Sequence, residues 1–271
     1  MEEMHMKIFI SADIEGTAGI THWDETEKGK GDYAYFAEQM TREVKAACDG
    51  ANNVGTKEIW IKDAHDSGRN IDPSKLPENI KLIRGWSGHP FSMVQRLDNS
   101  FDALLYTGYH SWGGSNFSPL AHTMNSTNIN YMKVNGEIFS EFLLHTYAAA
   151  YVGVPIAFLS GDKGVCEQAK ALNENIVTVA VNEGLGNSTL SIHPNLAVRQ
   201  IKEGVEKALK GDLNKCKISL PEKFELEIGY MVHTKAMSSS FYPGAKLVGP
   251  KVVSLTVDDY FDVLRAVHFL G

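Results

Sequence analysis

The feature that most constrains this chain is a series of short apolar runs, each followed at once by polar residues or glycine. The runs alternate with segments of helical periodicity and cover residues 7–12, 58–62, 103–107 and 156–160. Nearly continuous apolar runs separated by helices are typical of parallel strands that are buried on both faces of a sheet. The sequence therefore predicts an α/β fold whose ligands gather at the carboxyl ends of the strands.

Two local patterns between these runs predict further elements. Apolar residues recur at helical spacing over 33–51 with charges between them, so this segment is expected to cover one face of the sheet. Asn135 and Gly136 stand between two alternating segments, which is a strong hairpin signal. Ser140 is then expected to cap a helix that runs to about residue 151.

The C-terminal part has a different organisation. The pattern loosens after residue 162, and the next predicted element is a helix over 194–210, where Pro194 suits the first turn. The remaining elements are expected to be strands at 225–233 and 252–257 and a helix at 258–270. They predict a smaller α+β domain over residues 191–271, which follows an α/β domain over residues 1–190 that contains the metal-binding and catalytic residues.

Composition and charge exclude several classes of partner. The 271-residue chain carries a formal net charge of -7, which argues against a nucleic-acid groove. No segment reaches the roughly 20 apolar residues of a membrane span, and the first six residues lack the apolar core of a secretion signal. A cytoplasmic protein with no nucleic-acid or membrane partner is expected.

The three cysteines are widely spaced and odd in number. Cys48, Cys166 and Cys216 form no Cys-x-x-Cys pair, so the sequence supports neither a disulfide framework nor a thiolate zinc site. Any metal is expected to be held by oxygen and imidazole ligands.

Two carboxylates follow the first apolar run on alternate positions. Successive strand residues point to opposite faces, so Asp13 and Glu15 are expected to project together, with Gly16 allowing a sharp turn beyond them. Adjacent carboxylates repel each other unless a proton or a cation intervenes. The segment predicts either a metal site or an acid and a base that share a proton.

Histidines follow two other apolar runs. His65 comes after the second run and His110 after the third. Each could be a hydrogen-bonded structural residue, but imidazole nitrogens beside carboxylate oxygens are what zinc and its first-row neighbours select. The carboxyl ends of the strands are therefore the expected place of a metal centre.

Three more residues are candidates for this centre. Glu141 begins an otherwise apolar helix face, where a carboxylate is costly unless it is paired. Glu137 is the alternative ligand, although an exposed charge beside the Asn135-Gly136 turn needs no explanation. His122 follows a polar loop and lies close enough in sequence to His110 to reach the same cleft, where it could move protons.

Four segments, in this order, resemble the zinc-dependent D-aminopeptidase family. They are Ser11-Ala-Asp-Ile-Glu-Gly16, Asp63-Ala-His65, Gly108-Tyr-His110 and Ala121-His-Thr-Met124. The resemblance spans about the first 165 residues and is weaker afterwards.

The resemblance implies a Rossmann-like domain with a mostly parallel sheet and covering helices, plus a smaller α+β domain. It implies two zinc ions per subunit, with His122 as the catalytic residue and Asp13 as the bridging ligand. The implied metal ligands are Asp13, Glu15, His65, His110 and Glu141. Members of the family assemble as large rings, so a homo-oligomer such as a ring-shaped decamer is expected.

The main functional hypothesis is therefore a binuclear zinc aminopeptidase or amidase. It would release an N-terminal residue, often of D configuration, from short peptides or amino acid amides by attack of a metal-bound hydroxide. Two alternatives remain at the level of sequence. One is a binuclear metal phosphoesterase, and the other is a peptide-binding protein that keeps a metal only for structure.

Overall fold

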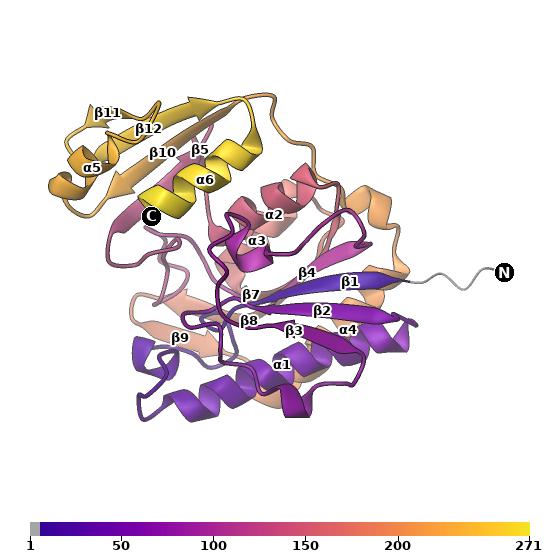
Figure 1. The fold of residues 1–271 in the computed structure, drawn as a ribbon. Coiled ribbons are helices and arrows are strands. Elements are labelled where there is room, and N and C mark those ends of the chain that lie inside the picture. Colours follow the sequence, from indigo (N-terminus) through magenta and orange to yellow (C-terminus); the bar gives the residue numbers. More distant parts are fainter. Residues whose placement is uncertain (1–5) are drawn as a thin grey trace.

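The computed structural model describes residues 6–271 and contains two sheets with their covering helices (Figure 1). Residues 1–5, which carry most of the segment used to argue against a secretion signal, lie outside the described residues. Within residues 6–271, the larger sheet has seven strands in the order β3-β2-β1-β4-β7-β8-β9. The smaller sheet has five strands in the order β11-β12-β10-β5-β6.

The larger sheet is parallel except for its last pair, β8 and β9, which are antiparallel. Its strands are β1 (Lys7–Ala12), β2 (Glu58–Asp63), β3 (Ile80–Ile83), β4 (Ala103–Tyr109), β7 (Ile156–Asp162), β8 (Val177–Leu185) and β9 (Ser188–Ser191). Its helices are α1 (Tyr33–Asn53), α2 (Glu141–Tyr151), α3 (Lys163–Leu172) and α4 (Pro194–Lys210).

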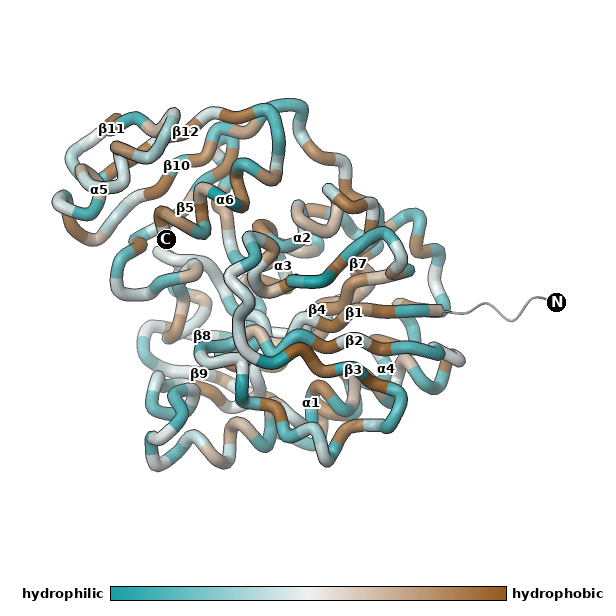
Figure 2. The backbone as a smooth tube through the Cα atoms, in the orientation of Figure 1, coloured by the Kyte–Doolittle hydropathy of each residue, from teal (hydrophilic) through white to brown (hydrophobic). Residues whose placement is uncertain are grey.

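Helices cover both faces of this sheet. α1 and α4 lie on one face, where Ile8 and Ile10 of β1 point into the core that the two helices share with the sheet. α2 and α3 lie on the other face, where Phe9 belongs to a second core. Figure 2 shows hydrophobic residues concentrated along the central strands. Successive side chains of β1 therefore point into the two cores in turn, as expected for a strand that is buried on both faces.

The smaller sheet is antiparallel and lies above α2 and α3 in Figure 1. Its elements are β5 (Ile129–Val134), β6 (Glu137–Ile138), β10 (Phe224–Tyr230), β11 (Lys246–Gly249) and β12 (Val252–Val257), with helices α5 (His233–Ser239) and α6 (Tyr260–Leu270). The hairpin at Asn135-Gly136 joins β5 to β6, and β5 pairs with β10 across a long stretch of sequence. The core on the α2 side continues into this sheet.

The predicted fold class is confirmed: a mostly parallel sheet with covering helices stands beside a second, smaller sheet. Strands β3, β8, β9 and β11 and helices α3 and α5 were not predicted, and the strand expected at 225–233 ends at Tyr230. Residue 190 lies within β9. β5 and β6 precede it and belong to the smaller sheet, while α4 follows it and covers the larger one. The division of the chain there stays a prediction.

The ability of the helices to span a membrane and the state of the cysteines can both be described from the structure. Among residues 6–271, no helix combines the length and the apolar character needed to cross a membrane. Cys48, Cys166 and Cys216 are all buried and have free thiols. Because burial raises the pKa of the Cys48 thiol to about 12, this residue stays protonated at neutral pH.

Candidate metal centre

Three neighbouring strands bring most of the predicted ligands to one edge of the larger sheet. β1 lies between β2 and β4, parallel to both. Asp13 and Glu15 follow β1, His65 follows β2, and His110 follows β4. Because parallel strands end at the same edge, these four side chains meet although nearly 100 positions separate the first from the last.

Glycine allows the ends of β1 and β4 to touch. The amide of Gly16 donates a 2.8 Å hydrogen bond to the carbonyl oxygen of Gly108. A Cβ atom on Gly16 would lie 1.8 Å from the carbonyl oxygen of Tyr109. Gly108 has a φ of +67°, and a Cβ atom on it would lie 2.2 Å from the carbonyl oxygen of Asp13. The close approach that assembles the site therefore requires glycine at both positions.

Asp63 shapes the loop that carries His65. It is buried at the end of β2, and its carboxylate accepts hydrogen bonds from the backbone amides of Asn70 and Ile71 at 2.6 and 2.9 Å. The Asn70 amide group also donates to the carboxylate and to the carbonyl oxygen of His65. Asp63 therefore holds the loop that carries His65 in place and does not itself line the site.

Glu141 reaches the same edge from the start of α2. The hydroxyl of Ser140 accepts a hydrogen bond from the amide of Leu143 and caps this helix, as predicted. The Glu141 side chain is buried and accepts a 2.6 Å hydrogen bond from the backbone amide of Met124. Met124 has a φ of 63°, an uncommon conformation for a residue other than glycine. This bond ties the loop that carries His122 to the carboxylate.

In each of the three histidines of the site, one ring nitrogen forms a hydrogen bond with a backbone carbonyl oxygen. A carbonyl oxygen can only accept, so the bonded nitrogen carries a proton, and the other nitrogen is the one that can bind a metal once it is deprotonated. The pairs are His65 Nε2 with the oxygen of Thr26 at 3.0 Å, His110 Nδ1 with that of Ser111 at 2.8 Å, and His122 Nδ1 with that of Leu120 at 2.9 Å. This is the arrangement by which proteins orient metal-binding imidazoles.

The other ring nitrogens face the carboxylates in three groups of possible metal ligands. Glu15, His110 and His122 form one of them, and the remaining two share Asp13. Asp13, Glu15 and His65 form one group, and Asp13, His110 and Glu141 form the other; within each group one ligand atom per residue lies within 4.8 Å of the others. The distances are 3.4 Å from His65 Nδ1 to Asp13 Oδ1, 3.0 Å to Glu15 Oε2, 3.5 Å from His110 Nε2 to Asp13 Oδ2, and 3.3 Å to Glu141 Oε2.

Several atoms in these groups lack a hydrogen-bond partner among the described residues. They are Asp13 Oδ2, Glu15 Oε2 and His110 Nε2, all buried. A buried polar atom without a partner costs about 1–3 kcal/mol, and more when it is charged. Carboxylate oxygens and imidazole nitrogens together suit zinc and related divalent ions. The residues present therefore fit two metal ions, with Asp13 common to two of the groups.

The pKa values of the carboxylates diverge. Burial, followed by the charge of Glu15, raises the pKa of Asp13 well above its usual value. Burial also acts to raise the pKa of Glu15, but the charge and hydrogen bond of His65 outweigh it and the pKa is lowered. At Glu141, the charges of His110 and His122 overcome burial and lower the pKa to about 2. Three buried carboxylates thus need positive charge nearby, which protons on histidines or metal ions can supply.

His122 lies at the edge of the cluster. Its Nε2 is 3.4 Å from Glu141 Oε1 and 4.0 Å from Glu15 Oε1, and its ring stacks on that of His110 with centroids 4.2 Å apart. The side chain is 12% exposed, whereas that of His110 is 1% exposed. Burial, followed by the charge of His110, lowers the pKa of His122, so its ring gives up its proton more readily than a free imidazole does.

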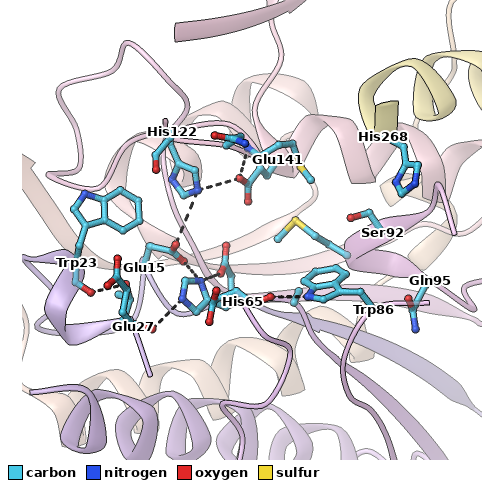
Figure 3. A pocket seen from close by; sticks show the side chains of 18 of the residues that line it. Glu15, Trp23, Glu27, His65, Trp86, Ser92, Gln95, His122, Glu141 and His268 are labelled. Atoms are coloured by element: carbon cyan, nitrogen blue, oxygen red, sulfur yellow. Dashed lines mark hydrogen bonds and ion pairs between the residues drawn. The ribbon is translucent and has the colours of Figure 1, made fainter. Parts of the chain in front are cut away.

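The cluster lies on the floor of a cavity of about 720 Å³ that opens to solvent. Figure 3 shows Glu15, His65, His122 and Glu141 gathered in its centre, with Trp23 and Glu27 on one side of them. On the other side are Trp86, Ser92 and His268. The cluster therefore lies between two parts of the cavity wall.

Glu137, the alternative ligand, is exposed on β6 and takes no part in these groups. Sequence reasoning missed the backbone carbonyls that orient the histidines. It also missed Asp162, which accepts hydrogen bonds from the amide and hydroxyl of Ser111 at 2.5 and 2.6 Å and so fixes the carbonyl partner of His110. The signal in the sequence for this packing is Gly161, beside Asp162, since a Cβ atom on it would lie 2.0 Å from the carbonyl oxygen of Tyr109.

Comparisons with known proteins agree with this site. The profile of the D-aminopeptidase family, Peptidase M55, matches residues 6–269. The D-aminopeptidase of Bacillus subtilis (strain 168) is 28% identical over 263 residues, which cover 96% of this chain and 95% of that protein. The solved structure of the Zn-dependent D-aminopeptidase DppA from Bacillus subtilis, a self-compartmentalizing protease, has a TM-score of 0.90 with 27% identity. That alignment covers 98% of this chain and 96% of the other.

This fold, the match along nearly the whole chain and the buried cluster together define a hydrolase of the metallo-aminopeptidase class. Within that class, the chain belongs to the D-aminopeptidase family.

Proposed function

We propose that this protein is a binuclear zinc aminopeptidase. Asp13, Glu15 and His65 would hold one zinc ion, and Asp13, His110 and Glu141 the other, with Asp13 as the bridging ligand. The observation that carries this proposal is the pair of ligand groups that share one buried carboxylate on the floor of an open cavity. The zinc dependence of the similar DppA structure supports the choice of metal.

Zinc bound there would polarise the scissile carbonyl and make water a stronger acid. The described residues supply the rest of the chemistry. The carbonyls of Thr26, Ser111 and Leu120 hold the three imidazoles in one tautomer. His122, partly exposed and with a lowered pKa, takes up a proton at Nε2 and delivers it to the leaving amine. Acid–base catalysis by a positioned histidine contributes roughly 10²–10⁴-fold in rate.

The substrates we propose are short peptides and amino acid amides with a free amino terminus, often of D configuration. Glu27 and Asp66 are exposed carboxylates that line the cavity, and no described residue that lines it is lysine or arginine. Such a lining attracts an ammonium group and repels a phosphate. This charge pattern favours an aminopeptidase over the alternative phosphoesterase.

We also propose that the chain forms a homo-oligomer, such as a ring-shaped decamer. Large apolar side chains are exposed in and around α5 and β11, among them Phe241 at 81% and Val248 at 57%. Leu185 and Leu190 of the β8–β9 hairpin are exposed at 75% and 74%. Exposed apolar side chains in such number suit contacts between subunits. The similar DppA structure is described as self-compartmentalizing. The three free thiols suit the cytoplasm, the compartment we expect.

The test compares hydrolysis of D-alanine amide and L-alanine amide before chelation, after chelation and after the return of zinc. Activity that disappears with the metal and returns with it is expected. Glu141→Gln should remove most of this activity, while Glu137→Gln serves as the matched control because that side chain is exposed on the neighbouring hairpin. If zinc-loaded protein leaves both amides and a panel of short peptides intact, the proposed function is wrong.

A further inference from the structure

Trp86 lines the main cavity but takes no part in the ligand groups of the candidate metal centre. It lies across the cluster from Trp23 and Glu27 (Figure 3). Trp86 is 42% exposed, so much of the indole is open to solvent. Such a side chain offers a large apolar surface to whatever binds in the cavity.

The indole of Trp86 is fixed at its edge and through the backbone beside it. Its Nε1 donates a 2.6 Å hydrogen bond to the carbonyl oxygen of Asp66. The amide of the preceding residue, Gly85, donates a 2.9 Å hydrogen bond to the carbonyl oxygen of Gly68. A Cβ atom on Gly68 would lie 2.6 Å from the nitrogen of Gly85, so this contact requires glycine at residue 68. A ring that is already held in place loses little conformational freedom when a ligand packs on it.

A buried lysine lies against one face of the ring. Lys62, in β2, is fully buried, and its Nζ is 3.7 Å from the centroid of the Trp86 ring. Nζ also donates hydrogen bonds to the carbonyl oxygens of Asp63 and Gly85 at 2.6 and 2.8 Å. Burial lowers the pKa of Lys62 to about 8, so the amine still carries its charge at pH 7. The ammonium group thus contacts two carbonyl oxygens and the π face of the indole.

This contact decides which part of a substrate the ring can accept. Lys62 lies against one face of the indole and does not line the cavity, so the cavity meets the opposite face or the edge of Trp86. A cation on one face disfavours a second cation on the other, because like charges repel. The ammonium group of a substrate is therefore better placed near the exposed carboxylate of Glu27, on the other side of the cluster (Figure 3).

We propose that Trp86 is a specificity-determining residue that contacts the side chain of the second residue of the substrate and favours an aromatic side chain there. With the ammonium group on the Glu27 side, the scissile bond lies at the cluster and the leaving part of the peptide extends toward Trp86. A ring such as that of phenylalanine packs on the open surface of the indole, and Lys62 is a positioning residue that acts through the indole. The proposal rests on the aminopeptidase function proposed above and names the substrate class within it.

The test compares substrates that differ in the second residue. Alanyl-phenylalanine carries an aromatic ring there, alanyl-glycine has no side chain, and alanine amide lacks a second residue. All three carry the alanine enantiomer whose amide is hydrolysed faster, and the faster phenylalanine enantiomer is used. We expect the zinc-loaded protein to give a kcat/KM for alanyl-phenylalanine about tenfold above that for alanyl-glycine, since an aromatic pair adds to the burial of apolar surface. A ratio near one, with the amide hydrolysed, overturns the role of Trp86 alone.

Variants of two tryptophans assign the preference. In Trp86→Ala the phenylalanine-over-glycine ratio should fall to about one, whereas Trp86→Phe should keep most of it because an aromatic surface remains. Trp23→Ala, on the other side of the cluster, is the matched control and should keep the original ratio. Both rates come from one preparation, so any general loss of activity cancels. A ratio that stays at its original value in Trp86→Ala overturns the proposal.

A third variant tests the anchor of the ring. Lys62→Met removes the ammonium group and should lower the ratio through a higher KM for alanyl-phenylalanine, because the indole is then held less firmly. An unchanged ratio overturns the positioning role of Lys62. Should this variant fail to fold, the variants of Trp86 still decide the main proposal. Absence of amide hydrolysis by the zinc-loaded original protein would instead overturn the aminopeptidase function itself, and the role of Trp86 with it.

Discussion

Two buried glutamates in this molecule have nearly the same exposure and opposite pKa shifts. Glu141 in the candidate metal centre is 4% exposed and Glu43 in α1 is 1% exposed. Burial acts to raise the pKa of both carboxyl groups, and at Glu43 it prevails, so the pKa is about 7. At Glu141 the charges of His110 and His122 outweigh burial, so the pKa is about 2. Burial alone therefore does not set the charge of a carboxyl group here; the balance between burial and the charges of its neighbours does.

The groups that donate hydrogen bonds to Glu43 are neutral, and the charge of Arg42 lowers its pKa less than they do. Its Oε1 accepts hydrogen bonds from the amide group of Gln39 at 2.9 Å and from the backbone amide of Ala18 at 3.0 Å, while Oε2 has no hydrogen-bond partner among the described residues. Ala18 lies three residues after Glu15, so Glu43 holds the loop that leaves the metal centre. One region thus accumulates charge that suits a metal, and in the other a carboxyl group that keeps its proton up to about pH 7 serves as a structural hydrogen-bonding group.

The largest expected effect is at the shared carboxylate. Asp13→Asn should abolish binding of both metals and lower activity by more than the roughly 100-fold that loss of a group supporting a metal ligand costs. Zinc content per chain and amide hydrolysis are the measurements. Asp66→Asn, which changes an exposed carboxylate of the same cavity, is the control. Asp13→Asn protein with full zinc content and activity within tenfold of the original would contradict the assignment.

His122 should show the next largest effect, and without loss of metal. His122→Gln is expected to lower kcat by roughly 10²–10⁴-fold because the proton-transferring imidazole is gone. The pKa of His122 lies below its ordinary value, so activity of the original protein should fall as the pH drops through that pKa, and the variant should lack this acid limb. If the variant still loses activity at low pH in the same way, another titrating group causes that loss.

Glu43→Gln should change the pH dependence of stability. With its pKa raised from 4.5 to about 7, Glu43 releases its proton less readily in the folded state. The folded protein therefore loses stability as the pH rises from about 4.5 to 7, by about 3 kcal/mol in total. Chemical unfolding should show that the variant gains this amount relative to the original protein between pH 4 and pH 8. Equal curves for the two proteins would mean that Glu43 titrates normally; Glu38→Gln, an exposed change on the same helix, is the control.

The smallest effect is expected at the neutral partner of Glu43. Gln39→Met removes a donor that favours the charged carboxylate, so the pKa of Glu43 should rise further. The variant should be less stable at pH 8 than at pH 5 by about 1 kcal/mol more than the original protein, which is the usual contribution of one hydrogen bond. Unfolding at the two pH values measures this difference. A loss of the same size at both values would show that Gln39 acts through packing alone.

Much of the larger sheet could be predicted because each of these strands has a recognisable apolar pattern within its own residues. The runs of β1, β2, β4 and β7 are apolar and end in polar residues, so both the sheet and the edge that gathers Asp13, His65 and His110 follow from them. α3 was missed because its buried face is short: only Gly164, Val165, Cys166 and Ala169 are buried.

The rest depends on contacts that no local pattern encodes. The pairing of β5 with β10 joins residues near 130 to residues near 228, so the smaller sheet takes strands from both parts of the chain. The carbonyls that orient the histidines have no side-chain signature. Glu43 appears in the sequence as one charged residue of an amphipathic helix, and only the packing of α1 against the rest of the protein reveals that it is buried.

The central claim is that two zinc ions are bound by two ligand groups that share Asp13. Diffraction from crystals of the zinc-loaded protein, recorded on both sides of the zinc absorption edge, tests it most directly. We predict two anomalous peaks per chain, one among Asp13, Glu15 and His65 and one among Asp13, His110 and Glu141. A single peak, or peaks that lie away from Asp13, would contradict the claim.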